Sequence, residues 1–298
     1  MSAALEFRAV DILFCAKAGR RASSAAIHKA LAALDAGGTR AEIAEETGVV
    51  VGVASASLSV ERGEISVLMG LSGSGKSTLL RAANGLNRVT RGQVLVGDGD
   101  TIVDIGAHCD PATLRHIRRL RIAMVFQQFG LLPWRTVRDN VGLGLELRGD
   151  SPDVRRRIID QHLELVGLSQ WGERYCSELS GGMQQRVGLA RALATDADIL
   201  LMDEPFSALD PLIRRKLQDE LLALQERVKK TILFVSHDLD EALKLGDKVT
   251  ILESGRIVQT GTGRDIVERP ADDYVAEFVR HVNPRTAIKG AAVARTAP

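Results

Sequence analysis

Eight consecutive residues have the types and the spacing of a phosphate-binding loop. Residues 70–77 read Gly-Leu-Ser-Gly-Ser-Gly-Lys-Ser and fit the pattern G-x-x-x-x-G-K-[ST]. Glycines suit this task because backbone N–H groups must wrap the phosphates without side chains in the way. In this pattern Lys76 reaches the β- and γ-phosphates, and the Ser77 hydroxyl coordinates Mg²⁺. The alternative is a glycine-rich turn that matches the pattern by chance.

The segments on either side of this loop favour the phosphate-binding interpretation. An apolar run at residues 64–69 predicts a strand, and a helical pattern runs from Lys76 to about Asn87. A strand, a glycine loop and a helix in this order place the positive end of the helix at the phosphates. The predicted phosphate-binding residues are Gly70, Ser72, Gly73, Ser74, Gly75, Lys76, Ser77 and Thr78.

Two carboxylates follow a second apolar run. Residues 199–202 predict a buried strand, and Asp203 and Glu204 stand at its end. In open α/β sheets, ligands bind at the carboxyl ends of the strands. Asp203 is therefore predicted to hold Mg²⁺ through water, and Glu204 to polarise an attacking water as general base. Such a pair alone is equally typical of a surface turn, but after a phosphate loop it favours catalysis.

A third motif opens another helix. Ser180, Gly181 and Gly182 precede a helical pattern that runs to Ala194. A helix start of this kind binds anions, although Ser180 alone is more typical of an ordinary N-cap. One nucleotide does not need two phosphate cradles far apart in the sequence. The pair therefore suggests a dimer in which each subunit closes over the nucleotide of the other.

The periodicity along the chain predicts an α/β fold. Apolar runs alternate with helical patterns, which is typical of a parallel sheet, and Ser254-Gly255 indicates a hairpin. Outside this alternation, residues 25–48 predict two short helices, with a capping box at Thr39 and Glu42 and a stop at Gly48. Strands are predicted at 93–96, 122–126, 199–202, 231–235, 248–253 and 256–259, and helices at 137–147, 153–166, 182–194, 212–228 and 239–245.

Composition and charge exclude several classes of protein. The 298 residues carry a formal net charge of +1, which gives no electrostatic case for binding nucleic acid. Apolar stretches such as 199–202 are far shorter than the roughly 20 residues that cross a bilayer. Residues 1–6 lack the pattern of a secretory signal, and three scattered cysteines indicate reduced thiols. The basic runs at 115–121 and 155–157 are typical of solvated helix faces, with contact to lipid head groups as the weaker alternative.

Further motifs, in order along the chain, resemble those of the ATP-binding cassette (ABC) family. Gln127 resembles the glutamine of the family's Q-loop, which contacts Mg²⁺, and residues 207–210, ending in Asp210, resemble the D-loop at the dimer interface. His237 resembles the switch histidine that hydrogen-bonds the γ-phosphate. The resemblance spans about residues 5–284.

The resemblance implies the fold, the domain organisation and the reaction. The expected fold is α/β: a P-loop NTPase domain with a parallel-sheet core, an antiparallel β subdomain and an α-helical subdomain. The nucleotide-binding domain is expected at 1–282, with a helical insert at about 22–48 and a helical subdomain at about 135–190, and residues 283–298 are expected to be a disordered tail. Two copies are expected to sandwich ATP, to bind Mg²⁺ and to hydrolyse ATP to ADP and phosphate.

The resemblance also implies an aromatic residue that stacks on adenine near the first strand. Phe14 is the candidate, with a core residue of the strand as the alternative. Cys15 stands where relatives are expected to carry glycine, and the segment from there to the phosphate loop is unusually long.

The solute and the partners follow only from the resemblance. The insert and residues 69–75 are similar to the ATPase subunits of importers for glycine betaine, proline betaine and choline, and residues 126–136 and 142–148 resemble the choline branch. With Pro298 as the last residue of the sequence, the paired regulatory CBS modules of many betaine relatives are not expected. The expected partners are a second copy, membrane permease subunits near residues 127–134, and indirectly a periplasmic or lipid-anchored solute-binding protein, but no nucleic acid. The expected location is the cytoplasmic face of the inner membrane, and the alternatives are an importer ATPase for amino acids or sulfonates and a non-transport ABC ATPase.

Overall fold

The structure, a computed structural model, describes residues 3–16 and 22–280. Within these residues the strands are β1 (Ala3–Cys15), β2 (Val49–Glu61), β3 (Ile65–Met69), β4 (Arg91–Asp98), β5 (Thr101–Asp104), β6 (Ile122–Val125), β7 (Ile199–Asp203), β8 (Thr231–Val235), β9 (Lys248–Glu253) and β10 (Arg256–Gly261). The helices are α1 (Ser24–Asp35), α2 (Arg40–Thr47), α3 (Lys76–Ala82), α4 (Pro111–Leu120), α5 (Val137–Val141), α6 (Leu143–Arg148), α7 (Pro152–Leu165), α8 (Gly181–Ala194), α9 (Pro211–Val228), α10 (Leu239–Leu245), α11 (Gly263–Glu268) and α12 (Asp273–Val279), with 3₁₀ turns at Ser169–Trp171 and Cys176–Glu178.

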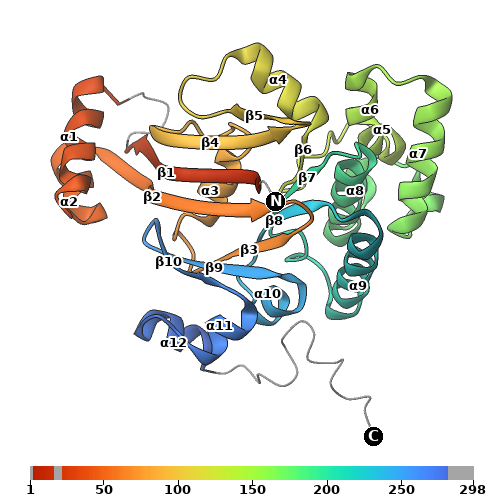
Figure 1. The fold of residues 1–298 in the computed structure, drawn as a ribbon. Coiled ribbons are helices and arrows are strands. Elements are labelled where there is room, and N and C mark those ends of the chain that lie inside the picture. The colour runs from red at the N-terminus through yellow and green to blue at the C-terminus, as the bar shows by residue number, and fades with distance from the viewer. Residues whose placement is uncertain (1–2, 17–21, 281–298) are drawn as a thin grey trace, which may run out of the picture.

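Two sheets build the centre of the molecule (Figure 1). The larger sheet has the order β10-β9-β3-β8-β7-β6, in which β9, β3, β8, β7 and β6 run parallel and β10 forms a hairpin with β9. The smaller sheet, β2-β1-β4-β5, is antiparallel. The predicted parallel core, the antiparallel part and the hairpin at Ser254-Gly255 are confirmed.

The strand β3 is buried on both faces and separates two hydrophobic cores. Its residues alternate between the faces, so that Val67 and Met69 join the core that contains α8 and α9, whereas Leu68 joins the core between the two sheets. Leu79 and Leu80 of α3 belong to that second core, which holds α3 between the sheets. The start of α3 is thereby fixed at the carboxyl end of β3, where ligands of parallel sheets bind.

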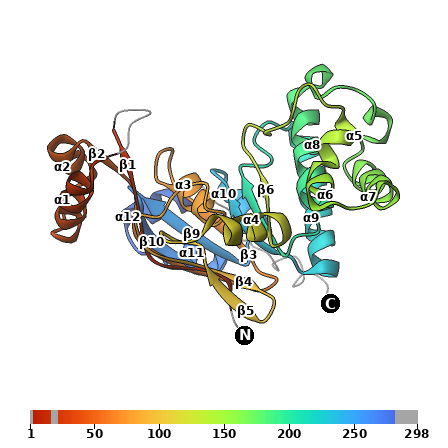
Figure 2. The same ribbon diagram turned by 90° about the horizontal axis from the view of Figure 1, so that it is seen from above.

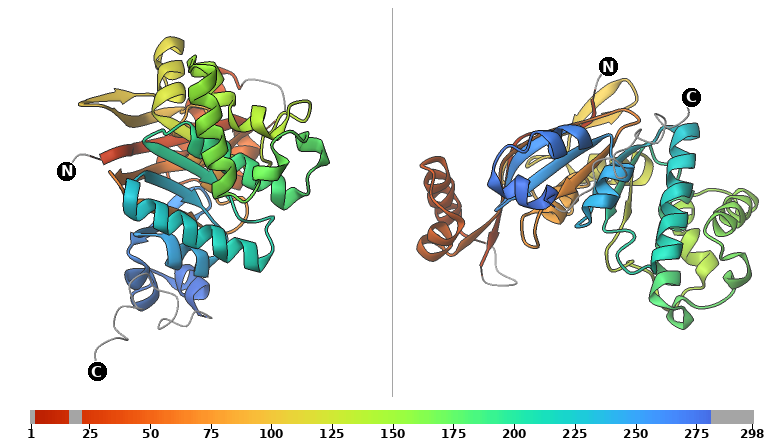
Figure 3. Two further views of the ribbon diagram at one scale, coloured as in Figure 1. Left: turned by 90° about the vertical axis from the view of Figure 1, so that its right-hand side faces the viewer. Right: turned by 90° about the horizontal axis from the view of Figure 1, so that it is seen from below.

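The helices α1 and α2 form a compact unit on β2, at the opposite end of the molecule from α5 to α7 (Figures 2 and 3). Ala30, Leu34 and Ile43 pack with valines of β2 in a small hydrophobic cluster. The capping box predicted at Thr39 and Glu42 is confirmed, with Thr39 N donating to Glu42 Oε2 at 2.8 Å. Gly48 ends α2 in the left-handed conformation, as predicted.

The helix predicted at 137–147 is wrong as a single helix. The structure breaks it at Gly142 into α5 and α6. A side chain at Gly142 would begin 2.7 Å from Ile159 Cδ1, so α7 packs closer to this point than a residue with a Cβ would allow. The helix after the phosphate loop also ends early, at Ala82 instead of about Asn87, before Gly85 with φ +66°.

In the described ranges, no helix is both long enough and apolar enough to cross a membrane. The proposed tail at 283–298 lies outside the described residues. The boundaries expected for the insert, the helical subdomain and the nucleotide-binding domain stay predictions.

Candidate nucleotide-binding site

The phosphate loop joins the end of β3 to the start of α3, as the sequence pattern requires. Lys76 is buried, and its Nζ donates to Gly70 O at 2.8 Å and to Leu71 O at 3.0 Å. Burial lowers the pKa of Lys76, while the negative charges of Glu204 and Asp203 oppose that shift. The ammonium group is therefore held directly over the loop and facing the two carboxylates.

A hydrogen bond joins the loop to the first carboxylate. Ser77 Oγ donates to Asp203 Oδ1 at 2.6 Å, and Asp203 is fully buried at the end of β7. Arg81, one turn further along α3, donates to Asp203 Oδ2 at 2.9 Å. Hydroxyl and carboxylate oxygens are the ligands that Mg²⁺ prefers, so this pair fits the ion. The Ser74 hydroxyl, buried in the same loop, has no hydrogen-bond partner within the described residues.

The three predicted catalytic side chains meet at one carboxylate. Gln127 Nε2 donates to Glu204 Oε2 at 3.2 Å, and His237 Nδ1 lies 3.3 Å from the same oxygen. These residues come after β6, β7 and β8, which are neighbours in the parallel sheet. Their strand order therefore brings together side chains that are far apart in the sequence.

The backbone of Glu204 is strained. Its φ of +50° lies in the left-handed region, which costs a non-glycine residue on the order of 1 kcal/mol or more. Several hydrogen bonds fix this conformation: Glu204 N donates to Val235 O at 3.1 Å, and Glu204 O accepts from Gln185 Nε2 at 3.3 Å. Strain that the surroundings hold in place is typical of functional positions, and here it sets the direction of the carboxylate.

Phe14 lies beside the start of α3. Its side chain is 38% exposed, and it pairs with Val50 across β1 and β2. A Cβ at Gly52 would meet the Phe14 ring at 2.6 Å and the Thr78 methyl group at 3.1 Å. The Phe14 ring therefore fills the space that a side chain at position 52 would need. It lies near Thr78, the last of the predicted phosphate-binding residues. Adenine stacking on Phe14 stays a prediction that this placement permits.

The second predicted cradle lies apart from the first. Ser180 caps α8 by accepting from Met183 N at 3.4 Å, and both Ser180 and Gly181 are exposed. Asp210 caps α9, and Gly182 lies next to the turn before it, since a Cβ there would be 3.3 Å from Leu209 Cδ2. In the described part of the chain, no hydrogen bond or ion pair joins Ser180, Gly181, Gly182 or Asp210 to residues 70–78.

Four residues of the site were not predicted. Arg81 follows Ser77 at helical spacing, a signal that could have indicated a shared partner. Gln185 contacts the backbone of Glu204 from α8, and Tyr274 of α12 accepts from Leu71 N at 3.2 Å. Arg40 of α2 donates to Gly73 O at 3.1 Å. The contacts of Tyr274 and Arg40 depend on tertiary packing and carry no local signal.

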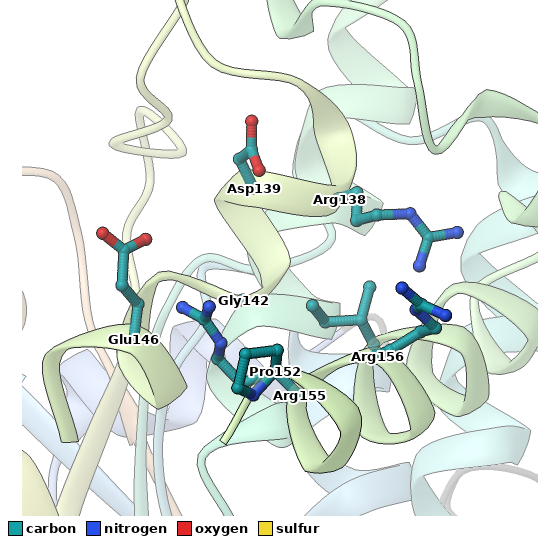
Figure 4. Close-up of a pocket in the computed structure, with 8 residues that line it drawn as sticks. Arg138, Asp139, Gly142, Glu146, Pro152, Arg155 and Arg156 are labelled. Atoms are coloured by element: carbon teal, nitrogen blue, oxygen red, sulfur yellow. The ribbon is translucent and has the colours of Figure 1, made fainter. Parts of the chain in front are cut away.

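A cavity of about 550 Å³ opens elsewhere, among α5, α6 and α7 (Figure 4). Arg138, Arg155 and Arg156 line it together with Asp139 and Glu146. The basic run at 155–157 is thus not simply a solvated face, because two of its side chains border a hollow of mixed charge. No side chain from the phosphate loop lines this cavity, which separates it from the nucleotide site.

Comparisons with known proteins identify the family. A family model described as ABC transporter matches residues 53–207. The ATP-binding protein ProV of the glycine betaine/proline betaine transport system of Escherichia coli is 52% identical over 89% of this chain, which spans 65% of the length of ProV. The ATP-binding protein TmoW of the trimethylamine N-oxide transport system of Ruegeria pomeroyi is 48% identical over 83% of this chain and 72% of its own length.

A solved structure agrees in fold. The dimeric structure of MJ0796, described as a bacterial ABC transporter cassette, superposes with a TM-score of 0.72 at 28% identity, over 87% of this chain and 99% of that one. The expected α/β cassette fold is confirmed, with its parallel core and its antiparallel and helical parts. The family match covers the phosphate loop, the cradle at Ser180 and the Asp203-Glu204 pair. This chain therefore belongs to the ABC transporter family.

Proposed function

We propose that the chain is the ATP-hydrolysing subunit of an importer for small solutes that carry a quaternary or otherwise fully alkylated nitrogen. One observation supports ATP hydrolysis by this chain. Gln127 and His237 both contact Oε2 of Glu204. The neighbouring Asp203 accepts a hydrogen bond from Ser77 of the phosphate loop. A structural turn would not require a strained glutamate with two polar partners from neighbouring strands.

The residues divide the chemistry of phosphoryl transfer to water among them. Lys76 and the positive end of the strand-loop-helix unit hold the β- and γ-phosphates. Glu204 orients and polarises the attacking water, and His237 hydrogen-bonds the γ-phosphate from the other side of that carboxylate. Ser77, Asp203 and Gln127 would hold Mg²⁺, which would supply positive charge at the phosphate oxygens.

A second copy of the chain completes the site in this proposal. Ser180 and Gly181 present an exposed helix start, and they share no hydrogen bond with the phosphate loop of their own chain in its described parts. Such a start suits the γ-phosphate of a nucleotide bound to the partner. The similarity to a cassette whose structure is dimeric supports this arrangement. ATP then favours the closed dimer, because ADP lacks the phosphate that bridges the gap.

A membrane permease is the second proposed partner. Trp134 is 69% exposed at the end of the loop that begins at Gln127, and an exposed aromatic residue of this size suits a docking surface. The neighbouring Arg135 donates to Glu146 at 2.7 Å, which links this loop to the cavity of Figure 4. We place the subunit on the cytoplasmic face of the inner membrane, bound through the permease, with a periplasmic or lipid-anchored solute-binding protein acting on the far side.

The solute class rests on the relatives. The proteins that share 52% and 48% identity are named for glycine betaine/proline betaine and for trimethylamine N-oxide, and the choline transport protein OpuBA of Bacillus subtilis shares 42%. All of these solutes carry a nitrogen without hydrogen. The relatives therefore support this class of solute more strongly than they support either choline or betaine as the particular solute.

Two measurements test the proposal. Purified protein should release phosphate from ATP only with Mg²⁺, and Lys76→Ala should abolish this release, with Arg8→Ala on an exposed ion pair as the control. Cells that lack the subunit should lose uptake of radiolabelled glycine betaine or choline and regain it with the wild-type chain, but not with Lys76→Ala. Loss of amino acid or sulfonate uptake instead would reassign the solute, and absence of any transport defect would favour a non-transport ATPase.

A further inference from the structure

The helical insert α1–α2 reaches the phosphate loop through one side chain. Arg40 begins α2, and its guanidinium lies between β2 and the loop. Nε donates to Val51 O at 2.6 Å, Nη2 to Gly52 O at 3.2 Å and Nη1 to Gly73 O at 3.1 Å. Three carbonyl groups from two segments thus share one planar cation, which suits the fork of donors that arginine presents.

The carbonyl that Arg40 holds belongs to a glycine of the phosphate loop. Gly73 has φ +78°, and a Cβ there would meet nothing within 4 Å, so its conformation is not enforced by packing. A glycine without packing constraints loses more conformational entropy on ordering than any other residue. The hydrogen bond from Arg40 fixes the orientation of the peptide between Gly73 and Ser74, in the segment whose N–H groups are expected to meet the phosphates.

The Arg40 guanidinium also contacts the strand next to Phe14, the residue predicted to stack on adenine. Gly52, whose carbonyl accepts from Arg40, is the residue against which the Phe14 ring rests. The guanidinium therefore connects the phosphate-binding segment to the strand that carries the aromatic ring. Desolvation lowers the pKa of Arg40, but a guanidinium stays charged at every physiological pH.

The insert is otherwise anchored away from the loop. Among the described residues, its apolar side chains cluster with residues of β2 and β1, and Asp35 at the end of α1 pairs with Arg91 of β4. Neither of these contacts involves residues 70–78. The link between the insert and the nucleotide site is thus concentrated in Arg40.

We propose that Arg40 is a positioning residue that makes the helical insert part of the nucleotide site. It preorganises the phosphate loop, so that nucleotides bind more tightly. By thermodynamic reciprocity, a bound nucleotide stabilises the docked insert by the same factor. The inference rests on the proposed function, since it requires that the loop binds ATP and ADP.

Affinity measurements test the first half. Arg40→Gln should weaken binding of a fluorescent ADP analogue and of ATP about tenfold each, the size expected for losing hydrogen bonds from a charged donor. KM for ATP should rise by a similar factor, while kcat changes by less than about twofold. Arg40→Lys should lose less, because one ammonium reaches fewer of the three carbonyls. The control is Lys29→Ala, whose ammonium pairs only with Glu46 inside the insert at 3.5 Å.

Hydrogen exchange tests the second half. ADP should slow exchange of the α2 amides in the wild type and in Lys29→Ala, but not in Arg40→Gln. Wild-type affinity in Arg40→Gln, or ADP-dependent protection of α2 that survives the substitution, overturns the inference. If the wild type binds no nucleotide, or Lys76→Ala binds it equally well, the proposed function itself fails. These outcomes are distinguishable because the wild type and Lys76→Ala are measured beside the Arg40 variants.

Discussion

The two regions expected to contact phosphate differ in how far one chain completes them. The loop at residues 70–77 is held from several sides: by Asp203 through Ser77, by Arg40, and by Tyr274, whose hydroxyl accepts from Leu71 N and donates to Leu252 O. The helix start at Ser180 has only its own cap and an exposed face. If the proposed dimer forms, a single chain contributes one finished half-site, the loop at residues 70–77, and one open half-site, the helix start at Ser180.

This difference indicates where conformational entropy is lost when ligands and partners bind. Hydrogen bonds already hold the first region without a ligand, so we expect binding there to cost less ordering entropy. The open half-site carries an exposed polar helix start, whose free N–H groups water can satisfy, and in the proposed dimer a second chain would displace that water. Substitutions in the two regions should consequently separate nucleotide binding from dimer formation.

The largest effect should come from Glu204→Gln, which leaves both half-sites intact and removes the base. Phosphate release should fall at least about 100-fold, the range expected for loss of general-base catalysis. ATP binding should persist, and light scattering should detect an ATP-bound dimer that does not dissociate. Glu6→Gln, which alters an exposed carboxylate paired with Arg8, should behave as the wild type. Unchanged phosphate release by Glu204→Gln would refute the assignment of the base.

The second effect should come from Ser180→Arg, which breaks only the open half-site. A bulky cation at this exposed position should block closure against a partner and reduce hydrolysis at least about tenfold. Affinity of the single chain for ADP should stay unchanged. Ser169→Arg, on another exposed serine of the same helical part, is the matched control. A weaker ADP affinity in Ser180→Arg would show that the two regions are not independent.

A smaller effect should come from Phe14→Ala, which affects only the finished half-site. Loss of stacking on the base should weaken ATP and ADP equally, by about fivefold, within the range for aromatic contacts. Phe14→Tyr keeps the ring and should bind nucleotides as the wild type does. Isothermal calorimetry with ADP measures both variants. Equal affinity of Phe14→Ala and the wild type would assign Phe14 to the packing of β1 and β2 alone.

The smallest effect should appear next to His237, at a buried carboxyl that touches neither half-site. Glu241 accepts from Ser236 Oγ at 2.6 Å and from Gln218 Nε2 at 2.9 Å, and burial raises its pKa. A raised pKa in the folded state means that stability is full below the unfolded pKa and is lost as the pH rises through the folded value. The Tm of the wild type relative to Glu241→Gln should therefore decline with rising pH, by about 2 °C.

Thermal unfolding of both proteins from acidic to neutral pH measures this difference. All other groups titrate in both proteins, so a constant offset from the substitution does not affect the slope. A difference in Tm that stays flat, or that grows in favour of the wild type as the pH rises, contradicts the raised pKa.

Local patterns predicted most of the helices and strands around the phosphate loop well. The spacing of Lys76 and Ser77, the apolar run before Asp203, and the capping box at Thr39 depend on neighbours in the sequence, and the structure places each as expected. The site roles assigned to these residues stay predictions. The break at Gly142 was missed because one glycine in a helical pattern does not by itself predict a break, and the close neighbour Ile159 belongs to another helix.

Contacts between distant segments could not be predicted. Gln127 and His237 converge on Glu204 because β6, β7 and β8 are adjacent, and periodicity does not specify strand order. The same holds for Arg40 on Gly73. The long strands β1 and β2 were not singled out either, because bulges near Ala9 and Ser55, both at positive φ, interrupt their alternation.

The position of β3 in its sheet has a consequence for biosynthesis. Its two neighbours are β8 and β9, so residues 65–69 pair with segments that the ribosome delivers more than 160 residues later. The hydroxyl of Tyr274, which braces the loop at Leu71, comes later still. A nascent chain that ends between residues 78 and 230 thus contains the whole phosphate motif but lacks both strands that pair with β3. If the loop binds nucleotide as proposed and needs these contacts, we expect binding only after most of the described fold has been translated.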